Sequence, residues 1–386
     1  MTSCAAAPAS AVASPAAARS QRGIDPGHGL LAVALTLVAL GLVMVYSSTA
    51  VECDRRFGDP AFFLRRQLVW SLVAGLTLLL ARSTDYHALV RLSRLGTLAL
   101  CLLLIAVLFQ PGHKGAHRWF HLGAFQFQPS ELGKILLVLL CARECGRLGR
   151  LPTAPGLRQT LPLFAAVGAV VGLVAIEPDF GTALFLCAIT GVLLLAGAIP
   201  LRHLFVVGLP ASLAALAYGL TRLEHVRARL RVFLDPAGDV LGKGYQVHQS
   251  LIALGSGGLT GLGLGRSRQK LYFLPDDHTD FILAIIGEEL GLIGTLVVLA
   301  LFVALVGFGV RIALRAPDLE GRLVALGLTT AIGLQACMNI AVVTASMPTK
   351  GISLPFVSYG GSALVVTLGA VGLLLNVAAQ SRGPQP

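Results

Sequence analysis

Residues 274–281 gather three acids and a histidine at the point where a polar loop gives way to a long apolar run. A carboxylate within hydrogen-bond reach of a hydroxyl can remove its proton in a transition state. Asp280, the last acid before the apolar run, is therefore the candidate general base of this chain. The structural alternative is a helix start, in which Asp277 is the N-cap and Asp280 lies three residues further on.

The same polar loop, at about 221–280, is rich in arginine, lysine and glycine upstream of these acids. Its basic side chains suit a phosphate-bearing substrate or lipid headgroups, although a merely solvated loop would look similar. The glycine-dense run 255–265 is no dinucleotide fingerprint, because no strand–turn–helix unit surrounds it. We expect these glycines to let an irregular backbone approach the bilayer surface or a ligand. The basic clusters on either side of the glycines are Arg227, Arg229, Arg231, Arg266, Arg268 and Lys270.

A second candidate segment runs from Lys114 through Arg118 into residues 128–134, where Glu131 and Lys134 are three positions apart. Side chains at this spacing share one helix face, so these two can form an ion pair inside the membrane. Such a pair either stabilises a helix start or lines a polar cavity, because charges inside a membrane usually face a functional interior.

Two further segments resemble irregular turns beside apolar runs. Residues 177–182 contain Glu177 and Asp179, whose carboxylates can cap the next helix or face a site. Residues 347–362 contain two prolines and three glycines, which predicts a non-helical segment. Irregular backbone at membrane depth is tolerated only beside protein or water, so we expect this segment to line a cavity. Its polar side chains include Lys350 and Ser358.

Two pairs of polar residues deep within the later apolar runs are further candidates. Glu288 and Glu289 imply protein packing or a cavity around them, because buried acids are costly in lipid. Gln335 and Asn339 are one helical turn apart, and they either hold helices together by hydrogen bonds or point inward.

The elements that must position these residues are apolar runs of the length that a bilayer demands. Hydrophobic residues make up 55% of the 386-residue chain and charged residues only 13%, whereas a soluble domain of this length needs a more charged surface. A backbone in lipid must satisfy its own hydrogen bonds, so each run is predicted to be a helix. The sequence therefore predicts an all-α integral membrane protein with about ten transmembrane helices. The runs lie at about 29–48, 67–81, 95–109, 131–145, 160–176, 181–198, 203–220, 281–310, 322–345 and 361–379.

The net charge of +11 does not indicate a nucleic-acid-binding protein, because the basic residues lie mainly between the apolar runs. By the positive-inside rule, the excess of arginine in alternate short loops places both termini in the cytoplasm. The loop at about 221–280 is then a large extracytoplasmic loop between helices seven and eight. We expect residues 1–27 to be a disordered cytoplasmic tail, residues 28–380 the membrane domain, and residues 381–386 a short cytoplasmic tail.

The polar segments, in this order, resemble the SEDS family of bacterial cell-wall polymerases (shape, elongation, division and sporulation). The resemblance spans about residues 114–364, and the expected ten helices agree with the family across nearly the whole chain. MPTKG and IIGEELG are more similar to the division-specific members than to the elongation members. One departure is Asp276-Asp277, where the resemblance leads us to expect Glu followed by a small residue. The matching stretches are KGAHRW, FQPSELGK, EPDFGTA, FLDP, GYQ, QSLIALGSGGLTGLGLG, LPDDHTDFILAIIGEELG and MPTKGISLPFVSYGGS.

The resemblance implies a multi-pass enzyme of the bacterial inner membrane that polymerises lipid II into glycan strands at the division septum. Lipid II is an undecaprenyl-pyrophosphate disaccharide-pentapeptide, and the family's reaction inverts the anomeric centre with Asp280 as the catalytic residue. A class B penicillin-binding protein and other division proteins are the implied partners. A divalent cation, Mg²⁺ or Mn²⁺, is a candidate cofactor for stabilising the departing pyrophosphate, a task that Arg or Lys can also perform. The other matching positions, which we expect to contact the substrate, are Arg118, Glu131, Lys134, Asp179, Arg229, Lys350 and Ser358.

Three alternative functions stay open at this point. A lipid II flippase or lipid-linked transporter would use the same polar cavity but need no catalytic acid. A scaffold of the division complex would tolerate the replacement of Asp280. An elongation-type polymerase would perform the same chemistry at the sidewall of the cell instead of the septum.

Overall fold

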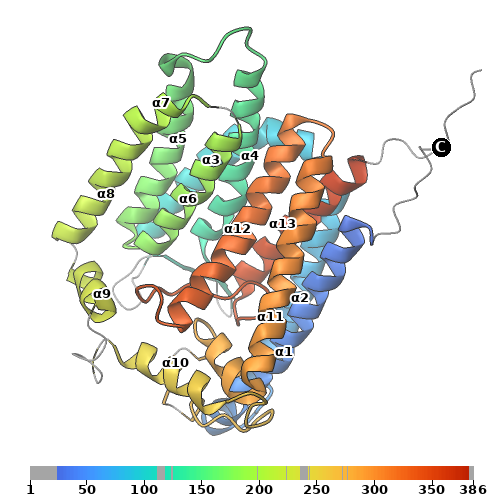
Figure 1. Ribbon diagram of the computed structural model, residues 1–386, viewed down its shortest axis with the longest axis vertical. Coiled ribbons are helices and arrows are strands. Elements are labelled where there is room, and N and C mark those ends of the chain that lie inside the picture. The colour runs from blue at the N-terminus through green and yellow to red at the C-terminus, as the bar shows by residue number, and fades with distance from the viewer. Residues whose placement is uncertain are drawn as a thin grey trace, which may run out of the picture.

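The computed structural model describes residues 24–110, 118–122, 125–197, 199–222, 224–234, 242, 244–271, 273–275 and 277–381 (Figure 1). Each of the ten expected apolar runs coincides with a helical segment, so the all-α architecture is confirmed. The β-structure among the described residues is limited to two three-residue strands that pair antiparallel. The elements are α1 (Pro26–Phe57), α2 (Phe62–Ser83), α3 (Tyr86–Leu108), β1 (Phe120–Leu122), β2 (Phe125–Phe127), α4 (Pro129–Gly149), α5 (Leu157–Ile176), α6 (Phe180–Ala196), α7 (Leu201–His203), the π-helical turn η2 (Leu204–Gly208), α8 (Leu209–Arg222), α9 (Glu224–Leu234), α10 (Tyr245–Ser256), α11 (Ile282–Arg315), α12 (Leu319–Val343) and α13 (Gly361–Gln380).

In the described part of the chain, eight helical segments are long and apolar enough to cross a membrane. They are α1, α2, α3, α5, the continuous stretch Leu201–Gly219, α11, α12 and α13. The two expected spans outside this group are α4, which carries several charged side chains, and α6, which has 17 residues. A multi-pass membrane protein is therefore confirmed, whereas the expected number of ten spans stays a prediction.

Helices α12 and α13 form the centre of the bundle (Figure 1). Helix α13 packs along α2 and also contacts α1, α4 and α12, and most of its side chains are buried. The stretch Leu201–Gly219 lies at the edge of the bundle, and little of it is buried. An apolar helix with so little protein contact is suited to face lipid.

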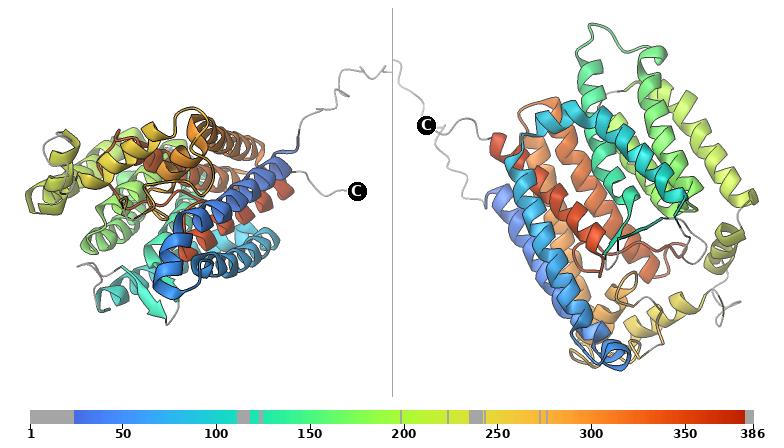
Figure 2. Two further views of the ribbon diagram at one scale, coloured as in Figure 1. Left: turned by 90° about the horizontal axis from the view of Figure 1, so that it is seen from below. Right: turned by 180° about the vertical axis from the view of Figure 1, so that it is seen from behind.

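Both described ends of the chain lie at one end of the bundle (Figure 2). Gly27, at the start of α1, lies against the side chains of Leu375 and Ala378 near the end of α13. The structure thus places the two described ends, at residues 24 and 381, on the same side, as expected. Their location in the cytoplasm stays a prediction.

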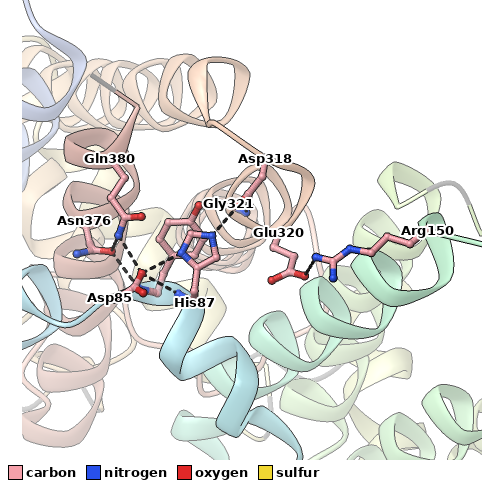
Figure 3. A network of polar contacts seen from close by, with 9 residues as sticks. Asp85, His87, Arg150, Asp318, Glu320, Gly321, Asn376 and Gln380 are labelled. Atoms are coloured by element: carbon pink, nitrogen blue, oxygen red, sulfur yellow. Dashed lines mark hydrogen bonds and ion pairs between the residues drawn. The ribbon is translucent and has the colours of Figure 1, made fainter. Parts of the chain in front are cut away.

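A polar network ties α3, α12 and α13 together at this terminal end (Figure 3). The two ring nitrogens of His87 lie 2.9 Å from Oδ1 of Asp85 and 2.7 Å from Oδ2 of Asp318. The hydroxyl of Tyr86 donates to the same oxygen of Asp318 at 3.1 Å, and the amide of Gln380 donates to Asp85 at 3.0 Å. Because Asp318 is the N-cap of α12, this network fixes the beginning of that helix.

Candidate active site

A polar cavity of about 320 Å³ lies at the end of the bundle opposite the termini. Its walls come from the first turns of α4, α6 and α13, from α12, and from the segments that precede α11 and α13. Five of the eight predicted site residues lie in these walls, although they are up to 162 positions apart in the chain (118 to 280). They are Arg118, Glu131, Lys134, Asp179 and Asp280.

Asp280 is fixed through a hydrogen bond to its backbone carbonyl, and a glycine lies next to its carboxylate. Its carbonyl oxygen accepts a hydrogen bond of 2.7 Å from the side-chain amide of Asn339, which donates equally to the carbonyl of Ile352. A Cβ atom at Gly351 would lie 3.0 Å from Oδ2 of Asp280, so the absence of a side chain there leaves room for the carboxylate. The following residue, Phe281, is buried and anchors the segment in the core.

The alternative interpretation of Asp277 and Asp280 as helix caps is wrong. Helix α11 begins at Ile282 with Phe281 as the N-cap residue, and no side chain caps it. Asp277 is buried, and its Oδ1 lies 3.0 Å from Nδ1 of His278. Burial raises the pKa of the Asp277 carboxyl, while the contact with His278 lowers it.

Glu131 and Lys134 form the ion pair that their spacing predicts, at 2.7 Å and with both side chains largely buried. The ammonium of Lys134 also donates to Oε1 of Gln335 at 2.7 Å, and the amide of Gln335 donates to the carbonyl of Ser353 at 2.9 Å. Gln335 and Asn339 therefore hold α4, α12 and the segment before α13 together, which is the interhelical role that the sequence suggested.

Arg118 organises the turn between α5 and α6. Its Nε donates to the carbonyl of Glu177 at 3.0 Å, and its Nη2 donates to the carbonyl of Pro178. The carboxylate of Asp179 caps α6 by accepting hydrogen bonds from the amide of Thr182 at 3.1 Å and from its hydroxyl at 2.9 Å. The capping interpretation of Asp179 is therefore confirmed, and the same residue also faces the cavity.

Glu177 does not act as a cap. Its side chain is fully buried, and neither carboxylate oxygen has a hydrogen-bond partner among the described residues. Burial raises the pKa of Glu177 to about 8, and the nearby charge of Asp179 adds to this effect while Arg118 opposes it. Glu177 is therefore largely protonated at neutral pH.

Lys350 lies beside the cavity with its alkyl chain against Gly181, where a Cβ atom would be 3.3 Å from its Cδ. Its ammonium nitrogen is buried and has no hydrogen-bond partner among the described residues. Burial lowers the pKa of Lys350, Asp179 raises it, and Arg229 lowers it. Arg229 on α9 is exposed and borders a separate small hollow, but the charges of Asp179 and Asp280 act on it.

Ser358 is buried and does not line the cavity. Its hydroxyl donates to the carbonyl of Thr279 and accepts a hydrogen bond of 2.8 Å from the amide of Leu354. The backbone amide of Tyr359 donates to the carbonyl of His278 at 2.9 Å. These bonds attach the segment before α13 to the residues just before Asp280, and the expected contact of Ser358 with substrate stays a prediction.

The expected helix at 281–310 contains a break that the sequence did not reveal. Gly291 has φ 69° and ψ −167°, so the hydrogen-bond ladder of α11 is interrupted there. Two carbonyls before the break accept hydrogen bonds from the glycine-dense loop, and two amides after it donate to that loop. The amide-to-carbonyl bonds are Leu262 to Glu288, Gly263 to Glu289, Leu292 to Gly258 and Ile293 to Leu259, at 2.9–3.2 Å.

These hydrogen bonds explain why the loop at 255–265 needs glycine, and the explanation differs from the expected one. A Cβ atom at Gly257 or Gly261 would overlap the backbone of α11 at Gly287 or Glu289. The close approach that glycine permits is therefore to another segment of the protein, instead of to lipid or a ligand.

Glu288 and Glu289 use their side chains to fix the residues after this loop. Glu288 accepts hydrogen bonds from the hydroxyl of Ser267 and from the amide of Arg268, the latter at 3.0 Å. Glu289 pairs with the ammonium of Lys270 at 3.0 Å and accepts a bond of 2.6 Å from the hydroxyl of Ser47 on α1. Lys270 is thus committed to an internal ion pair, and the protein packing expected around the two acids is confirmed.

Sequence reasoning missed three aromatic residues in the cavity wall, Trp119, Phe185 and Tyr359. Trp119 and Tyr359 lie inside polar segments that were singled out, but nothing in their spacing indicates that they face inward. Lys114, Asp235 and Asp276, which belong to motifs discussed above, lie outside the described residues.

Comparison with known proteins identifies the family. The model of the FtsW/RodA/SpoVE family, described as cell cycle proteins, matches residues 28–383. The "Probable peptidoglycan glycosyltransferase FtsW" of Geobacter sp. (strain M18) is 39% identical over 365 residues, which cover 92% of this chain and 97% of that one. Stage V sporulation protein E of Bacillus subtilis (strain 168) is 38% identical over 362 residues, with 93% and 98% covered.

Solved structures agree with the sequence comparison. A chain from a peptidoglycan synthase complex, described as coordinating polymerization and crosslinking, matches with a TM-score of 0.75 and 31% identity over 92% of this chain and 98% of that one. The rod shape determining protein RodA of Thermus thermophilus matches with a TM-score of 0.68 and 31% identity over 93% and 97%. The protein therefore belongs to the FtsW/RodA/SpoVE family of cell cycle proteins, the SEDS family that its motifs resemble.

Proposed function

We propose that this protein is a peptidoglycan glycosyltransferase that polymerises lipid II, with Asp280 as the general base. The observation that carries the proposal is the placement of the Asp280 carboxylate in the wall of a polar cavity at one end of a membrane bundle. A lipid-anchored substrate can present its headgroup at such a position while its chain stays in the bilayer. Relatives named as probable peptidoglycan glycosyltransferases, at about 40% identity over nearly the whole chain, support the assignment.

The reaction needs one base and one stabilised leaving group. The 4-hydroxyl of the acceptor sugar attacks the anomeric carbon of the donor and forms the glycosidic bond, while its proton passes to Asp280. The bond between the anomeric carbon and the pyrophosphate oxygen breaks, and undecaprenyl pyrophosphate leaves with the electron pair. A single displacement inverts the anomeric centre and requires no covalent sugar–enzyme intermediate.

Lys350 is the residue we assign to the departing pyrophosphate. Its ammonium has no hydrogen-bond partner among the described residues, and it interacts electrostatically with Asp179 and Arg229. A cation that is poorly solvated before the substrate arrives interacts strongly with a developing negative charge. Arg229 would add a second positive charge at the outer edge, whereas Arg118 already donates to two carbonyls.

With the described residues alone, a divalent cation would need ligands from the substrate as well as from the protein. The described residues hold no group of three His, Cys, Asp or Glu side chains that would form a complete protein site. Mg²⁺ often binds through one or two carboxylates plus substrate phosphates, so Asp280 would hold it together with the pyrophosphate of lipid II. Its contribution would be to neutralise charge on the leaving group.

The family relationship also supports a proposal for the partners and the location. We propose that a class B penicillin-binding protein crosslinks the strands, which is consistent with the matched chain from a synthase complex that couples polymerization to crosslinking. We place the protein in the bacterial inner membrane at the division septum, with the cavity facing outward. The relatives named FtsW support the division role over the elongation role.

The decisive experiment uses the purified protein with its partner and labelled lipid II, and it compares wild type with Asp280→Ala. Asp54→Ala is a matched control, because Asp54 is exposed near the end of α1 and does not line the cavity. We expect glycan strands from the wild type and from the control but none from Asp280→Ala. Polymer from Asp280→Ala would refute the role of Asp280. Label that crosses vesicles without forming polymer would indicate a flippase.

A further inference from the structure

The part of α11 that follows the break at Gly291 is long enough to span a bilayer core by itself. Residues 292–310 contain no charged side chain, and their 19 helical positions are about 29 Å long, against roughly 30 Å for the core. This stretch ends at Arg311, close to the end of the bundle that holds the termini, because Gly29 near the start of α1 lies against Phe308. Leu292 therefore lies where hydrocarbon meets headgroups at the cavity end of the bundle.

The glycine-dense loop is fixed at the same level. The amides of Leu292 and Ile293 donate to the carbonyls of Gly258 and Leu259, at 2.9 and 3.2 Å. Two bonds in the opposite direction, both of 3.0 Å, attach the loop to the last turn before the break. Because backbone hydrogen bonds hold the loop on both sides of the break, its depth relative to the spanning part of α11 is set by the protein.

Two leucines of this loop are exposed although the loop itself is held in place. Leu259 is 68% exposed and Leu264 is 56% exposed. Leu292 and Ile293, in the first turn of the spanning part, are also exposed, and little of the apolar stretch that follows is buried. Since Leu259 is bonded to Ile293 through the backbone, its side chain adjoins the lipid-facing surface of α11. A contiguous apolar surface of this kind indicates an interaction site, whereas a single exposed leucine would not.

Two arginines follow these leucines, and the loop does not compensate their charges. Arg266 and Arg268 are exposed, and neither side chain forms an ion pair among the described residues. The segment 244–271 contains no Asp or Glu, and its remaining basic residue, Lys270, is paired internally with Glu289. Apolar side chains next to free guanidinium groups are the combination that binds an anionic membrane surface.

We propose that the glycine-dense loop is inserted into the membrane leaflet at the cavity end and binds anionic phospholipids there. Leu259 and Leu264 lie among the upper parts of the acyl chains. Arg266 and Arg268 bind the phosphate groups above them. The level of the loop, its positive charge and its continuity with the lipid-facing surface of α11 favour lipid over another protein as the occupant.

The interaction goes beyond the glycosyltransferase reaction and does not depend on it. Its consequence for the site comes from the chain that follows the loop, which leads through Lys270 to Asp280. Glu288 and Glu289 hold the start of this connection on α11. A loop seated among headgroups would thus keep the connection at the level at which a lipid-anchored substrate presents its polar part.

The experiment places a tryptophan on the loop of the full-length protein in vesicles. Leu264→Trp adds the fluorophore, and the wild-type signal of Trp70 and Trp119 is subtracted. Leu296→Trp, on the exposed face of α11, is the control for lipid, and Asp54→Trp, at the charged end of α1, is the control for water. We expect brominated phospholipid to lower the fluorescence of Leu264→Trp and Leu296→Trp about twofold and to leave Asp54→Trp unchanged.

Acrylamide, a quencher dissolved in water, provides the opposite measurement. It should quench Asp54→Trp more strongly than Leu264→Trp. Strong quenching of Leu264→Trp by acrylamide, together with none by brominated lipid, would overturn the proposal and assign the loop to water or to another protein. Neither measurement requires polymer formation, so the outcome is independent of whether the proposed function holds.

A comparison of headgroups tests the role of the arginines. At equal mole fraction, brominated phosphatidylglycerol should quench Leu264→Trp more than brominated phosphatidylcholine, because the anionic lipid gathers at the loop. Adding Arg266→Gln and Arg268→Gln should remove this difference. Adding Arg55→Gln and Arg56→Gln, which change two exposed arginines at the end of α1, should preserve it. Equal quenching by the two lipids with the loop arginines present would refute the binding of anionic headgroups.

Discussion

The side-chain amide of Asn339 donates to the carbonyl oxygens of Asp280 and Ile352, both at 2.7 Å. One buried group on α12 thereby joins the segment before α11 to the segment before α13. These two segments bring Asp280 opposite Gly351. The residue that we propose as the general base is thus located in part by a hydrogen bond to its backbone carbonyl.

Asn339→Leu should lower kcat by about 10- to 100-fold, because a displacement of roughly 1 Å at a reacting group costs about that much. The leucine keeps the volume but cannot donate to either carbonyl. Steady-state kinetics with labelled lipid II would check this, and KM should change much less than kcat. Thr344→Ala is a suitable control, since among the described residues the Thr344 hydroxyl bonds only within and next to the end of α12. An equal loss in both variants would show that Asn339 has no special role in positioning.

Lys350→Arg should move the alkaline limb of the pH–rate profile to higher pH. Burial lowers the pKa of Lys350, so its positive charge is lost at a lower pH than for an exposed lysine. Arginine keeps its charge throughout the accessible range. Initial rates from pH 6 to pH 10 would test this. A profile that is identical for lysine and arginine would show that the charge of Lys350 does not limit activity.

Glu177→Gln should make the protein more stable at pH 8 and remove part of the pH dependence of unfolding. The Glu177 carboxyl has a pKa of about 8 in the folded protein against an ordinary value of 4.5. Between these values the folded state binds a proton that the unfolded chain has released, so stability falls as pH rises from about 4.5 to about 8. Glutamine resembles the protonated acid and lacks this dependence.

Thermal unfolding in detergent at pH 6 and pH 8 would measure the difference for Glu177→Gln. The wild type should lose more stability between these pH values than the variant. Glu52→Gln serves as the control, because Glu52 pairs with Arg56 at 3.0 Å near the same end of the bundle. Equal slopes for wild type and Glu177→Gln would contradict the prediction.

Gly291→Ala should destabilise the fold by about 2 kcal/mol or more, because φ is positive there and a Cβ atom would overlap the backbone of the glycine-dense loop. Gly307→Ala on the same helix is the matched comparison. A Cβ atom at Gly307 has no neighbour within 4 Å, and alanine favours the helix by up to about 1 kcal/mol. Denaturant unfolding of the two variants would measure the contrast, and similar stabilities would argue against the break at Gly291.

The helices could be predicted because lipid leaves the backbone few alternatives, so each apolar run had to satisfy its own hydrogen bonds. Local spacing was equally informative for the Glu131–Lys134 pair and for the cap formed by Asp179. The break at Gly291 could not be predicted, because its hydrogen bonds are satisfied by residues about 30 positions upstream. Long-range contacts of this kind leave no periodic signal in the sequence.

The same limit applies to individual site residues. Ser358 lies in a motif next to the cavity, but its hydroxyl is used between two backbone groups. Arg229 borders another hollow, because α9 lies outside the main bundle. Which member of a polar segment faces the cavity depends on the path of the backbone, and sequence spacing fixes that path only inside regular helices.

Helix α12 is capped by Asp318, which contacts His87 and Tyr86, and it carries Asn339 near its other end. The 21 intervening steps of helix span about 31 Å, close to the thickness of the hydrocarbon layer. Because one continuous helix joins these two sets of contacts, we expect a displacement of its first turn to move Asn339 as well. The position of the Asp280 backbone at one end of the bundle would then depend in part on contacts made at the opposite end.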